Sequence, residues 1–223
     1  MIEQFESGRR KVLIAGAADT GVPALVARVG AGYGIDMVVL DRCDTPLELN
    51  KQFFQRGSFP IRTMKCDLTL LDARAEFDVV VAHSVLQMIA ADRRADVLFR
   101  LGRSLRSGGR LLHVYNAGQS MSGGMLPAYR ESYGRWVCEH LDRDNVSLPE
   151  TRDVFRARLD AYALERQTRE GAFRDADEVD RLSEAAGLNV NQRLEIEAKL
   201  ANPMLKLASK VSRRRFISVA ERK

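Results

Sequence analysis

The sequence contains few cysteines and no long apolar run. Its cysteines are Cys43, Cys66 and Cys138, which are far apart and form no Cys-x-x-Cys pair. An odd, scattered set is typical of a protein kept in a reducing compartment, so we expect a cytoplasmic location and no disulfide framework. The uncharged apolar stretches are short, such as residues 79–82, whereas a membrane-spanning helix needs about 20 apolar residues. Residues 1–12 place acidic side chains ahead of basic ones without an apolar segment, so neither a secretory signal nor membrane association is expected.

A strong charge imbalance is also missing. The 223 residues include 35 Lys and Arg against 30 Asp and Glu, which gives a net charge of +5. Residues 1–117 contain 16 basic and 13 acidic residues, and residues 118–223 contain 19 and 17, so neither half is a basic arm. A tight basic run occurs at Arg213, Arg214 and Arg215. We therefore do not expect nucleic acid as a partner.

In the first half, short β-branched runs alternate with helical stretches. The expected strands cover residues 11–15, 36–40, 61–65, 77–82 and 110–115, with helices at 22–29, after Thr45, and at 85–89 and 92–105. Thr45 is expected to cap its helix, with Glu48 completing a capping box. Strands and helices in this order predict right-handed crossovers and a parallel sheet. The apolar run at 77–82 is typical of a central strand covered on both faces.

The second half begins with a stretch, residues 118–172, that has no strand signal. A helix is expected over 127–141, and a capping box from Ser147 to Glu150 predicts the start of another. A helix over 175–186 and strands over 189–198 and 215–220 follow. We therefore expect one domain over residues 1–223 that contains a helical insertion at 118–172. A chain of this length buries a sizeable core without a structural metal, and we expect no metal site.

Small or polar residues follow four successive strands of the predicted sheet. They are Gly16-Ala17-Ala18-Asp19-Thr20-Gly21, Asp41, Cys66-Asp67-Leu68 and His83-Ser84. Ligands of open parallel sheets bind beyond the carboxyl ends of the strands, where the strand order reverses. Small residues let the backbone approach a ligand, and an acid at the end of the second strand can accept both ribose hydroxyls. Each motif alone is weak, since Asp41 is equally suited to cap the next helix, but their joint placement favours an adenosine-containing ligand.

In this arrangement the chain resembles the class I S-adenosylmethionine-dependent methyltransferases. The sequence VLIAGAADTG resembles the first motif of that family, VVLDRC the second strand with its acid, KCDLT the adenine-edge motif, and FDVVVAHSVLQMI the fourth strand. The resemblance spans about residues 10–116 and then residue 173 to the end. It implies a Rossmann-like, doubly wound α/β fold: a mostly parallel seven-stranded sheet with an antiparallel last strand. Residues 118–172 lie between the two matched stretches, and we expect them to form a helical lid over the site.

The resemblance also implies S-adenosylmethionine as the cofactor and S-adenosylhomocysteine as the product. By position, the first loop would line the methionine and ribose, Asp41 would hold the ribose, Asp67 would bind the adenine edge, and His83 would lie near the methyl group. The implied cofactor-binding residues are Gly16, Ala17, Ala18, Asp19, Gly21, Asp41, Arg42, Cys66, Asp67, Leu68, Ala82 and His83.

Two features depart from the family pattern. The acid that usually stands two positions before the first glycine is Ile14 here, and Asp19 is a candidate to contact the methionine ammonium in its place. Only about ten residues precede the first strand, so the helix that commonly lies upstream is expected to be missing.

Methyl transfer from a sulfonium is an in-line displacement, so positioning and water exclusion account for much of the rate. A base is needed only if a small-molecule acceptor must lose a proton. His83 is the first candidate for that base and His140 the second, whereas His113 is expected in the core. Tyr115 and Asn116 are candidates to orient the acceptor. Tyr129, Tyr133 and Trp136 are expected either to form an apolar lid or simply to pack their helix.

The sequence gives less support to other functional classes. Gly118 to Ser122 just misses the serine-hydrolase motif, the phosphate-binding Gly-x-x-x-x-Gly-Lys pattern does not occur, and no tyrosine has a lysine four residues later. A catalytically inactive cofactor-binding or scaffold protein stays open as the alternative, ahead of a nicotinamide-dependent oxidoreductase. The sequence leaves open the acceptor, the atom that is methylated and the oligomeric state.

Overall fold

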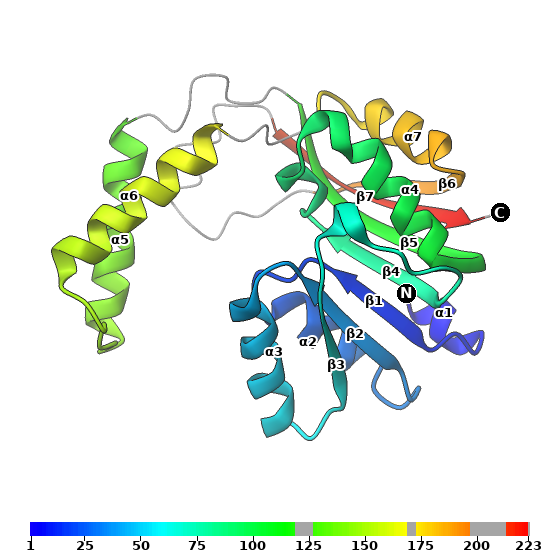
Figure 1. Cartoon of the computed structure of the whole chain (residues 1–223), viewed down its shortest axis with the longest axis horizontal. Helices are drawn as coiled ribbons and strands as arrows, with labels where there is room; N and C mark the ends of the chain where they lie inside the picture. The colour runs from blue at the N-terminus through cyan, green and yellow to red at the C-terminus, as the bar shows by residue number, and fades with distance from the viewer. Residues whose placement is uncertain (119–126, 169–172, 197–212, 223) are drawn as a thin grey trace.

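The computed structural model of the chain describes residues 1–118, 127–168, 173–196 and 213–222 (Figure 1). The described strands are β1 (Lys11–Ala15), β2 (Asp36–Asp41), β3 (Ile61–Lys65), β4 (Phe77–His83), β5 (Leu105–Gly118), β6 (Leu188–Ile196) and β7 (Arg213–Arg222). They form one seven-stranded sheet in the order β3-β2-β1-β4-β5-β7-β6. Strands β1 to β5 run parallel, and β7 runs antiparallel to both of its neighbours. This confirms the predicted mixed sheet.

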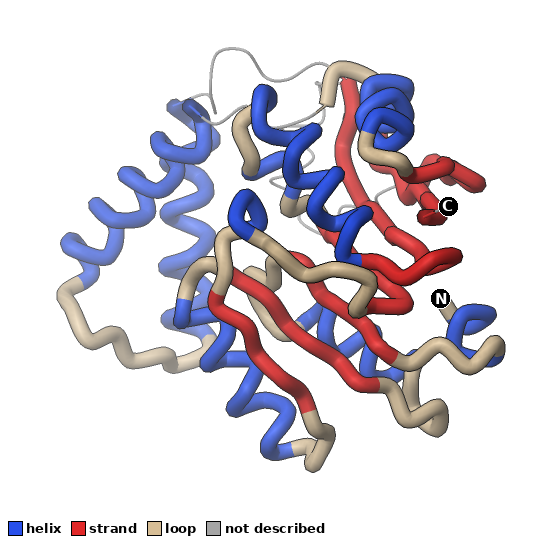
Figure 2. Tube along the Cα trace, turned by 45° about the vertical axis from the view of Figure 1, so that its right-hand side comes forward, coloured by secondary structure: helices blue, strands red, loops and turns tan. Residues whose placement is uncertain are grey.

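Helices cover both faces of the sheet (Figure 2). The described helices are α1 (Ile2–Glu6), α2 (Gly21–Val29), α3 (Asp44–Arg56), α4 (Arg94–Ser104), α5 (Pro127–Arg143), α6 (Arg152–Thr168) and α7 (Ala176–Ala185), with short 3-10 turns η1 (Leu68–Leu70), η2 (Leu86–Met88) and η3 (Ala91–Arg93). Helices α1, α2 and α3 pack on one face, and α4 and α7 on the other. The doubly wound arrangement is therefore confirmed.

The central strands are buried on both sides, as the apolar runs predicted. On β1, Val12 and Ile14 belong to the core beneath α2, whereas Leu13 and Ala15 belong to the core on the opposite face. Strands with two buried faces read as continuous apolar runs rather than as alternating patterns. Packing of the strands in these two cores sets the position at which each strand ends. It therefore also sets the place where the loops that follow the strands meet.

The expectation that no helix precedes the first strand was wrong. The helix α1 is short and has no side-chain cap, but its Phe5 is fully buried and its ring packs 5.8 Å from that of Tyr33. A five-residue helix is too short to be stable alone. Burial of Phe5 in the core stabilises it, which a local sequence pattern does not reveal.

Two predicted helix caps were also misplaced. The residue before α3 is Cys43, not Thr45, because the Asp41 carboxylate accepts the Cys43 N–H at 2.8 Å and starts the turn earlier. Helix α6 begins at Arg152 rather than within the box from Ser147 to Glu150, and Thr151 Oγ1 accepts the Val154 N–H at 3.4 Å. At α6 the side chain outside the predicted box satisfies one of the first backbone donors, whereas at α3 the Asp41 bond reaches only the N-cap residue.

Helices α5 and α6 pack side by side as a hairpin on the side of the sheet where the parallel strands end (Figures 1 and 2). This hairpin lies within the predicted insertion. Of the helices in the described part of the chain, none is long and apolar enough to cross a membrane.

Candidate functional site

The strand order reverses between β1 and β4. From β1 the chain builds outward through β2 to β3, and from β4 it builds through β5 to β7 on the other side. Crossovers that diverge in this way leave a crevice at the carboxyl ends of the two central strands, where ligands of such folds bind. The loops that follow β1, β2, β3 and β4 all begin at this edge.

The loop after β1 requires glycine at its first position. Gly16 has φ of +78°, and a Cβ atom there would lie 2.5 Å from Val85 Cγ2, so any larger residue meets both strain and a collision. The loop then exposes Ala18 and Asp19, and Gly21 is the exposed first residue of α2. Asp19 Oδ1 accepts the Gly21 N–H at 2.8 Å, which leaves its other oxygen available.

Asp41, at the end of β2, links two loops. One carboxylate oxygen accepts the Ala17 N–H at 3.1 Å and the other accepts the Cys43 N–H at 2.8 Å. Each carboxylate oxygen has a second lone pair, and the side chain is only half-buried. Neither bond goes to the first turn of α3, so Asp41 does not cap that helix. The two bonds hold the carboxylate in place without exhausting its ability to accept ribose hydroxyls.

Asp67, after β3, is held as a carboxylate. The Thr69 N–H and hydroxyl both donate to it at 2.8 Å, and these bonds lower its pKa, with help from the nearby Arg42 and Arg93 guanidinium groups. The preceding thiol is different: burial raises the pKa of Cys66, so it stays protonated. An ionised Asp67 is an acceptor only, which suits an amino group such as that of adenine.

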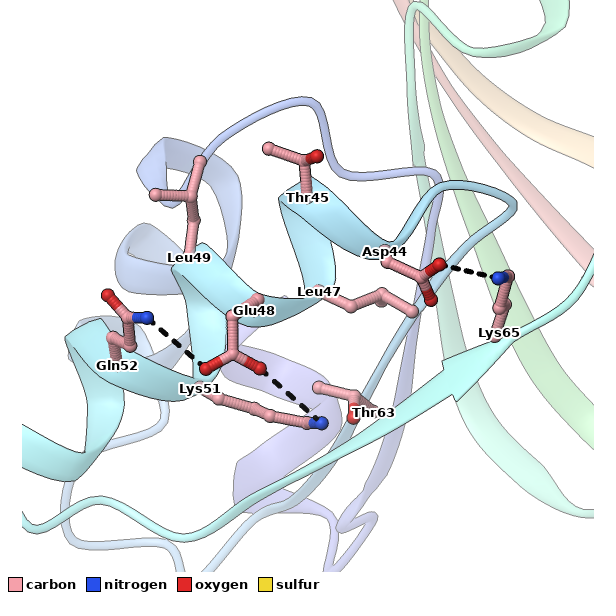
Figure 3. A pocket seen from close by; sticks show the side chains of 9 residues that line it. All are labelled: Asp44, Thr45, Leu47, Glu48, Leu49, Lys51, Gln52, Thr63 and Lys65. Carbon is pink, nitrogen blue, oxygen red and sulfur yellow. Dashed lines mark hydrogen bonds and ion pairs between the residues drawn. The ribbon is translucent and has the colours of Figure 1, made fainter. Parts of the chain in front are cut away.

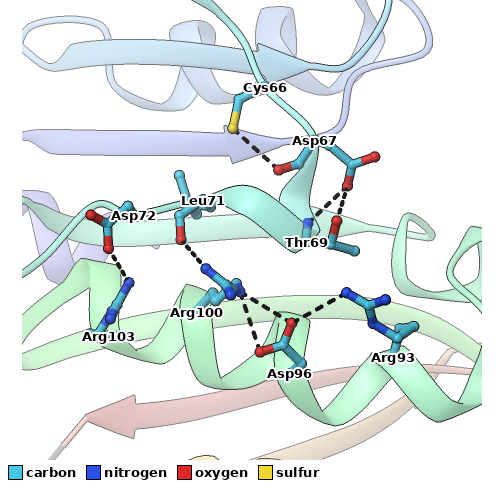
Figure 4. A network of polar contacts seen from close by, with 9 residues as sticks. All are labelled: Cys66, Asp67, Thr69, Leu71, Asp72, Arg93, Asp96, Arg100 and Arg103. Carbon is cyan, nitrogen blue, oxygen red and sulfur yellow. Dashed lines mark hydrogen bonds and ion pairs between the residues drawn. The ribbon is translucent and has the colours of Figure 1, made fainter.

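The loop that carries Asp67 is fastened to α4. Arg100 donates to the Leu71 carbonyl at 3.1 Å and pairs with Asp96, and Arg103 pairs with Asp72 (Figure 4). Leu68, next to Asp67, is buried in the core. Contacts with α4 therefore hold this loop in position without a ligand.

His83 is the last residue of β4 and is half-buried, whereas the preceding Ala82 is fully buried. Burial lowers the pKa of His83, the Arg215 guanidinium lowers it further, and Asp19 opposes them. The imidazole is therefore neutral at physiological pH and able to accept a proton. Its electrostatic coupling to Asp19 and Arg215 brings the first loop and β7 to the same place.

Tyr115 and Asn116, the two candidates on β5, lie on opposite faces of the sheet, because alternate residues of a strand face opposite sides. Tyr115 is fully buried among His113, Phe173 and Phe216, with its ring 5.5 Å from that of Phe216. Its proposed role in orienting an acceptor is therefore corrected: Tyr115 is a core residue. Asn116 is half-buried on the opposite face, and its N–H donates to Gln87 Oε1 at 2.8 Å.

On α5, Trp136 and His140 contact each other. Their ring centroids are 4.0 Å apart, and His140 Nδ1 lies 2.8 Å from the Trp136 carbonyl oxygen. Because a carbonyl only accepts, Nδ1 carries the proton and Nε2 is the basic nitrogen. Tyr129 and Tyr133 are on the same helix, but their side chains lie outside the described part of the structure.

Sequence reasoning missed Gln87 and Arg215. Gln87 is buried beside β5, and Arg215 was noticed only as part of a basic run. The register of β7 against β5 places Arg215 opposite Asn116. No cluster of three or more potential metal ligands occurs among the described residues.

A groove of about 610 Å³ lies between α3 and the edge strand β3 (Figure 3). Its charged side chains are already paired: Lys65 with Asp44 at 2.5 Å, and Lys51 with Glu48 at 3.8 Å. None of its lining residues belongs to β1 or β4, the two strands that flank the crevice.

The sheet order, the reversed last strand and the strand-end loops define the fold of a class I S-adenosylmethionine-dependent methyltransferase. Residues 17–113, which contain all four loops except Gly16, match the family model described as a methyltransferase domain. The match covers 97 of the 223 residues and identifies a methyltransferase domain in this part of the chain. A comparison with curated proteins found no match.

Solved structures share the fold at low sequence identity. The 1,6-didemethyltoxoflavin N1-methyltransferase of Burkholderia thailandensis, with 1,6-didemethyltoxoflavin and S-adenosylhomocysteine bound, is 18% identical with a TM-score of 0.60, covering 98% of this chain and 73% of that one. An S-adenosylmethionine-dependent methyltransferase from Methanosarcina mazei is 14% identical with a TM-score of 0.63, covering 99% and 96%. The (4+2) cyclase SpnF is 11% identical with a TM-score of 0.63, covering 99% and 79%. These likenesses concern the fold.

Proposed function

We propose that the chain is a methyltransferase that uses S-adenosylmethionine, releases S-adenosylhomocysteine and acts on a small-molecule acceptor by in-line displacement. The site would lie between the strand ends and the helical hairpin. The observation that carries the proposal is the convergence of the Gly16 loop, Asp41, Asp67 and His83 at one edge of the sheet. The whole chain then acts as one domain, with residues 118–172 inserted to cover the acceptor. The bound small molecule of the toxoflavin methyltransferase supports this acceptor class.

The residues at the strand ends fit S-adenosylmethionine. Gly16 packs against Val85 too closely for any Cβ atom, so glycine is what lets the first loop turn at the strand end, where the methionine portion would lie. Asp41 would accept the ribose hydroxyls, and Asp67 the adenine amino group. Asp19, exposed on the first loop, would face the methionine ammonium in place of the acid that Ile14 replaces. When bound, this cofactor supplies an electrophilic methyl group on a sulfonium.

Residues of the chain then have two tasks, to position the acceptor and to accept its proton. Neutral His83 would accept the proton of an acceptor that has one to lose, and Asn116 shares its face of the sheet. His140 is the second candidate base, since its Nε2 is the basic nitrogen. The hairpin α5–α6 would exclude water from the reacting atoms.

The proposal is tested by calorimetry and an acceptor panel. The protein is titrated separately with S-adenosylmethionine, S-adenosylhomocysteine and NAD, and small aromatic and aliphatic nucleophiles are then screened for methylation by mass spectrometry. We expect the two sulfur cofactors to bind, NAD not to bind, and at least one small acceptor to be methylated. Binding of NAD alone would refute the proposal, and cofactor binding without any turnover would favour an inactive binding protein.

A further inference from the structure

Arg215 lies on the same face of the sheet as His83. Val114 of β5 pairs with His83 on one side and with Ile217 of β7 on the other, so these three residues share a face. Asn116 is two residues further along β5 and pairs with Arg215, which therefore also faces that side. Adjacent strands are about 4.8 Å apart, so the long Arg215 side chain begins two strands from β4, at the end where β4 finishes.

The charge of Arg215 has no partner among the described residues. Its neighbour Arg214 faces the other side and pairs with Glu195, and Arg193 of β6 pairs with Asp177 and Asp180. Arg215 is half-buried, its Nε is buried without a hydrogen-bond acceptor, and no ion pair to it occurs in the described parts of the chain. A partly buried guanidinium without an acceptor is costly, so its retention at a ligand site favours a ligand that supplies one.

The surroundings of Arg215 leave its charge uncompensated. It is close enough to His83 to depress the pKa of that imidazole, so its field reaches the end of β4. The carboxylate that also influences His83 is Asp19, and one of its oxygens is already bonded to the Gly21 N–H. Arg215 therefore supplies a positive charge at this end of the sheet, with Asp19 as the carboxylate that acts on the same imidazole.

We propose that Arg215 binds an anionic group of the methyl acceptor, a carboxylate or a phosphate. This rests on the proposed function, because it places the acceptor beside His83. The guanidinium fork presents parallel N–H donors that match two anionic oxygens, which a single amide or lysine does not. The acceptor is thus held at its anionic end by β7, with its nucleophilic atom directed toward the methyl group.

The test uses the whole protein saturated with S-adenosylhomocysteine and four probes: inorganic phosphate, benzoate, and the neutral molecules benzamide and benzyl alcohol. Each is titrated into the native protein, Arg215→Gln, Arg215→Lys and the matched control Arg214→Gln. We expect benzoate or phosphate to bind the native protein and Arg214→Gln saturably, and the neutral probes not to bind. Arg215→Gln should lose about tenfold or more in affinity for the anion, and Arg215→Lys should recover part of it.

The relative response to benzoate and phosphate identifies the anionic group. Unchanged anion affinity in Arg215→Gln, or no saturable binding of either anion, would overturn the proposal. A fall in the melting temperature of Arg215→Gln together with its cofactor affinity would also overturn it, by showing that Arg215 stabilises the protein itself. Failure of the native protein to bind S-adenosylhomocysteine would instead remove the proposed function, so the two failures are distinguishable.

Discussion

The sheet and the hairpin α5–α6 are built in different ways. In the sheet, β1 and β4 are buried on both faces, and the loops at their ends are held by hydrogen bonds from other elements, such as Ala17 to Asp41. In the hairpin, α5 and α6 pack against each other, and apolar side chains such as Val154 remain exposed. The proposed cofactor half of the site is therefore specified by the protein core. The proposed acceptor half would depend on a separate element, the hairpin.

The comparison predicts that changes in the strand-end loops have the largest effects. Gly16→Ala places a Cβ atom 2.5 Å from Val85 Cγ2 on a residue with φ of +78°. We expect affinity for S-adenosylhomocysteine to fall by more than about tenfold, and the free energy of unfolding to fall by about 2 kcal/mol or more. Calorimetric titration and denaturant unfolding measure the two effects.

The control for this change is Gly32→Ala. Gly32 has a similar φ of +84°, but a Cβ atom there would meet nothing within 4 Å. It should cost only the backbone strain, about 1 kcal/mol, and leave cofactor affinity unchanged. Equal effects at the two glycines would show that strain alone, and not the approach to Val85, explains the result.

The next largest effect is expected at Asp41. Asp41→Ala removes the acceptor of two ribose hydroxyls and also the bonds to Ala17 and Cys43. Cofactor binding should weaken by roughly 1.5–3 kcal/mol, with a smaller loss of stability. The control is Asp36→Ala at the opposite end of β2, where the carboxylate pairs with Arg62 on the surface. If both variants bind S-adenosylhomocysteine as the native protein does, Asp41 only caps the loops.

These residues also show what the sequence alone could provide. Apolar runs located strands such as 11–15 at its observed bounds, and the strand expected in the mixed stretch 61–65 also has its observed bounds. The sequence could not show which of Tyr115 and Asn116 faces the core, because the alternation along a strand tells which residues share a face but not which face is buried. It also missed Arg215, since the antiparallel pairing of β7 with β5 joins residues about 100 positions apart in the chain. Long-range register is decided by tertiary packing, which local patterns do not contain.

The buried His113 in the core should make the free energy of unfolding depend on pH. Burial lowers the pKa of His113 from 6.5 to about 3, and neither ring nitrogen has a hydrogen-bond partner. The folded state therefore keeps His113 neutral while the unfolded chain takes up a proton, so stability present above the unfolded pKa is lost as the pH falls below it. Between about pH 7.5 and about pH 5.5 this costs about 1.3 kcal/mol.

The measurement compares native protein with His113→Phe. Denaturant unfolding at the two pH values should give a stability loss smaller by that amount in the variant, because phenylalanine fills a similar volume and does not titrate. The His83 contribution is present in both proteins and cancels to first order. An identical pH dependence would show that His113 is solvated or hydrogen-bonded in solution.

Substitutions in the hairpin are expected to have the smallest effect on cofactor affinity. The difference between the hairpin and the sheet should be clearest there. Trp136 contacts His140 within α5, on the side of the sheet where an acceptor would approach. Trp136→Ala should change affinity for S-adenosylhomocysteine by less than about 0.5 kcal/mol, since every proposed cofactor contact comes from β1 to β4. Turnover on an acceptor found in the panel should fall much more, about tenfold or more, through a higher KM.

Arg135→Ala, an exposed neighbour paired with Glu131, is the control and should leave both quantities unchanged. Circular dichroism confirms that α5 is intact. If Trp136→Ala lowers cofactor affinity and turnover together, along with the melting temperature, the hairpin is part of the folded core. The division of the site between a sheet for the cofactor and a hairpin for the acceptor would then be wrong.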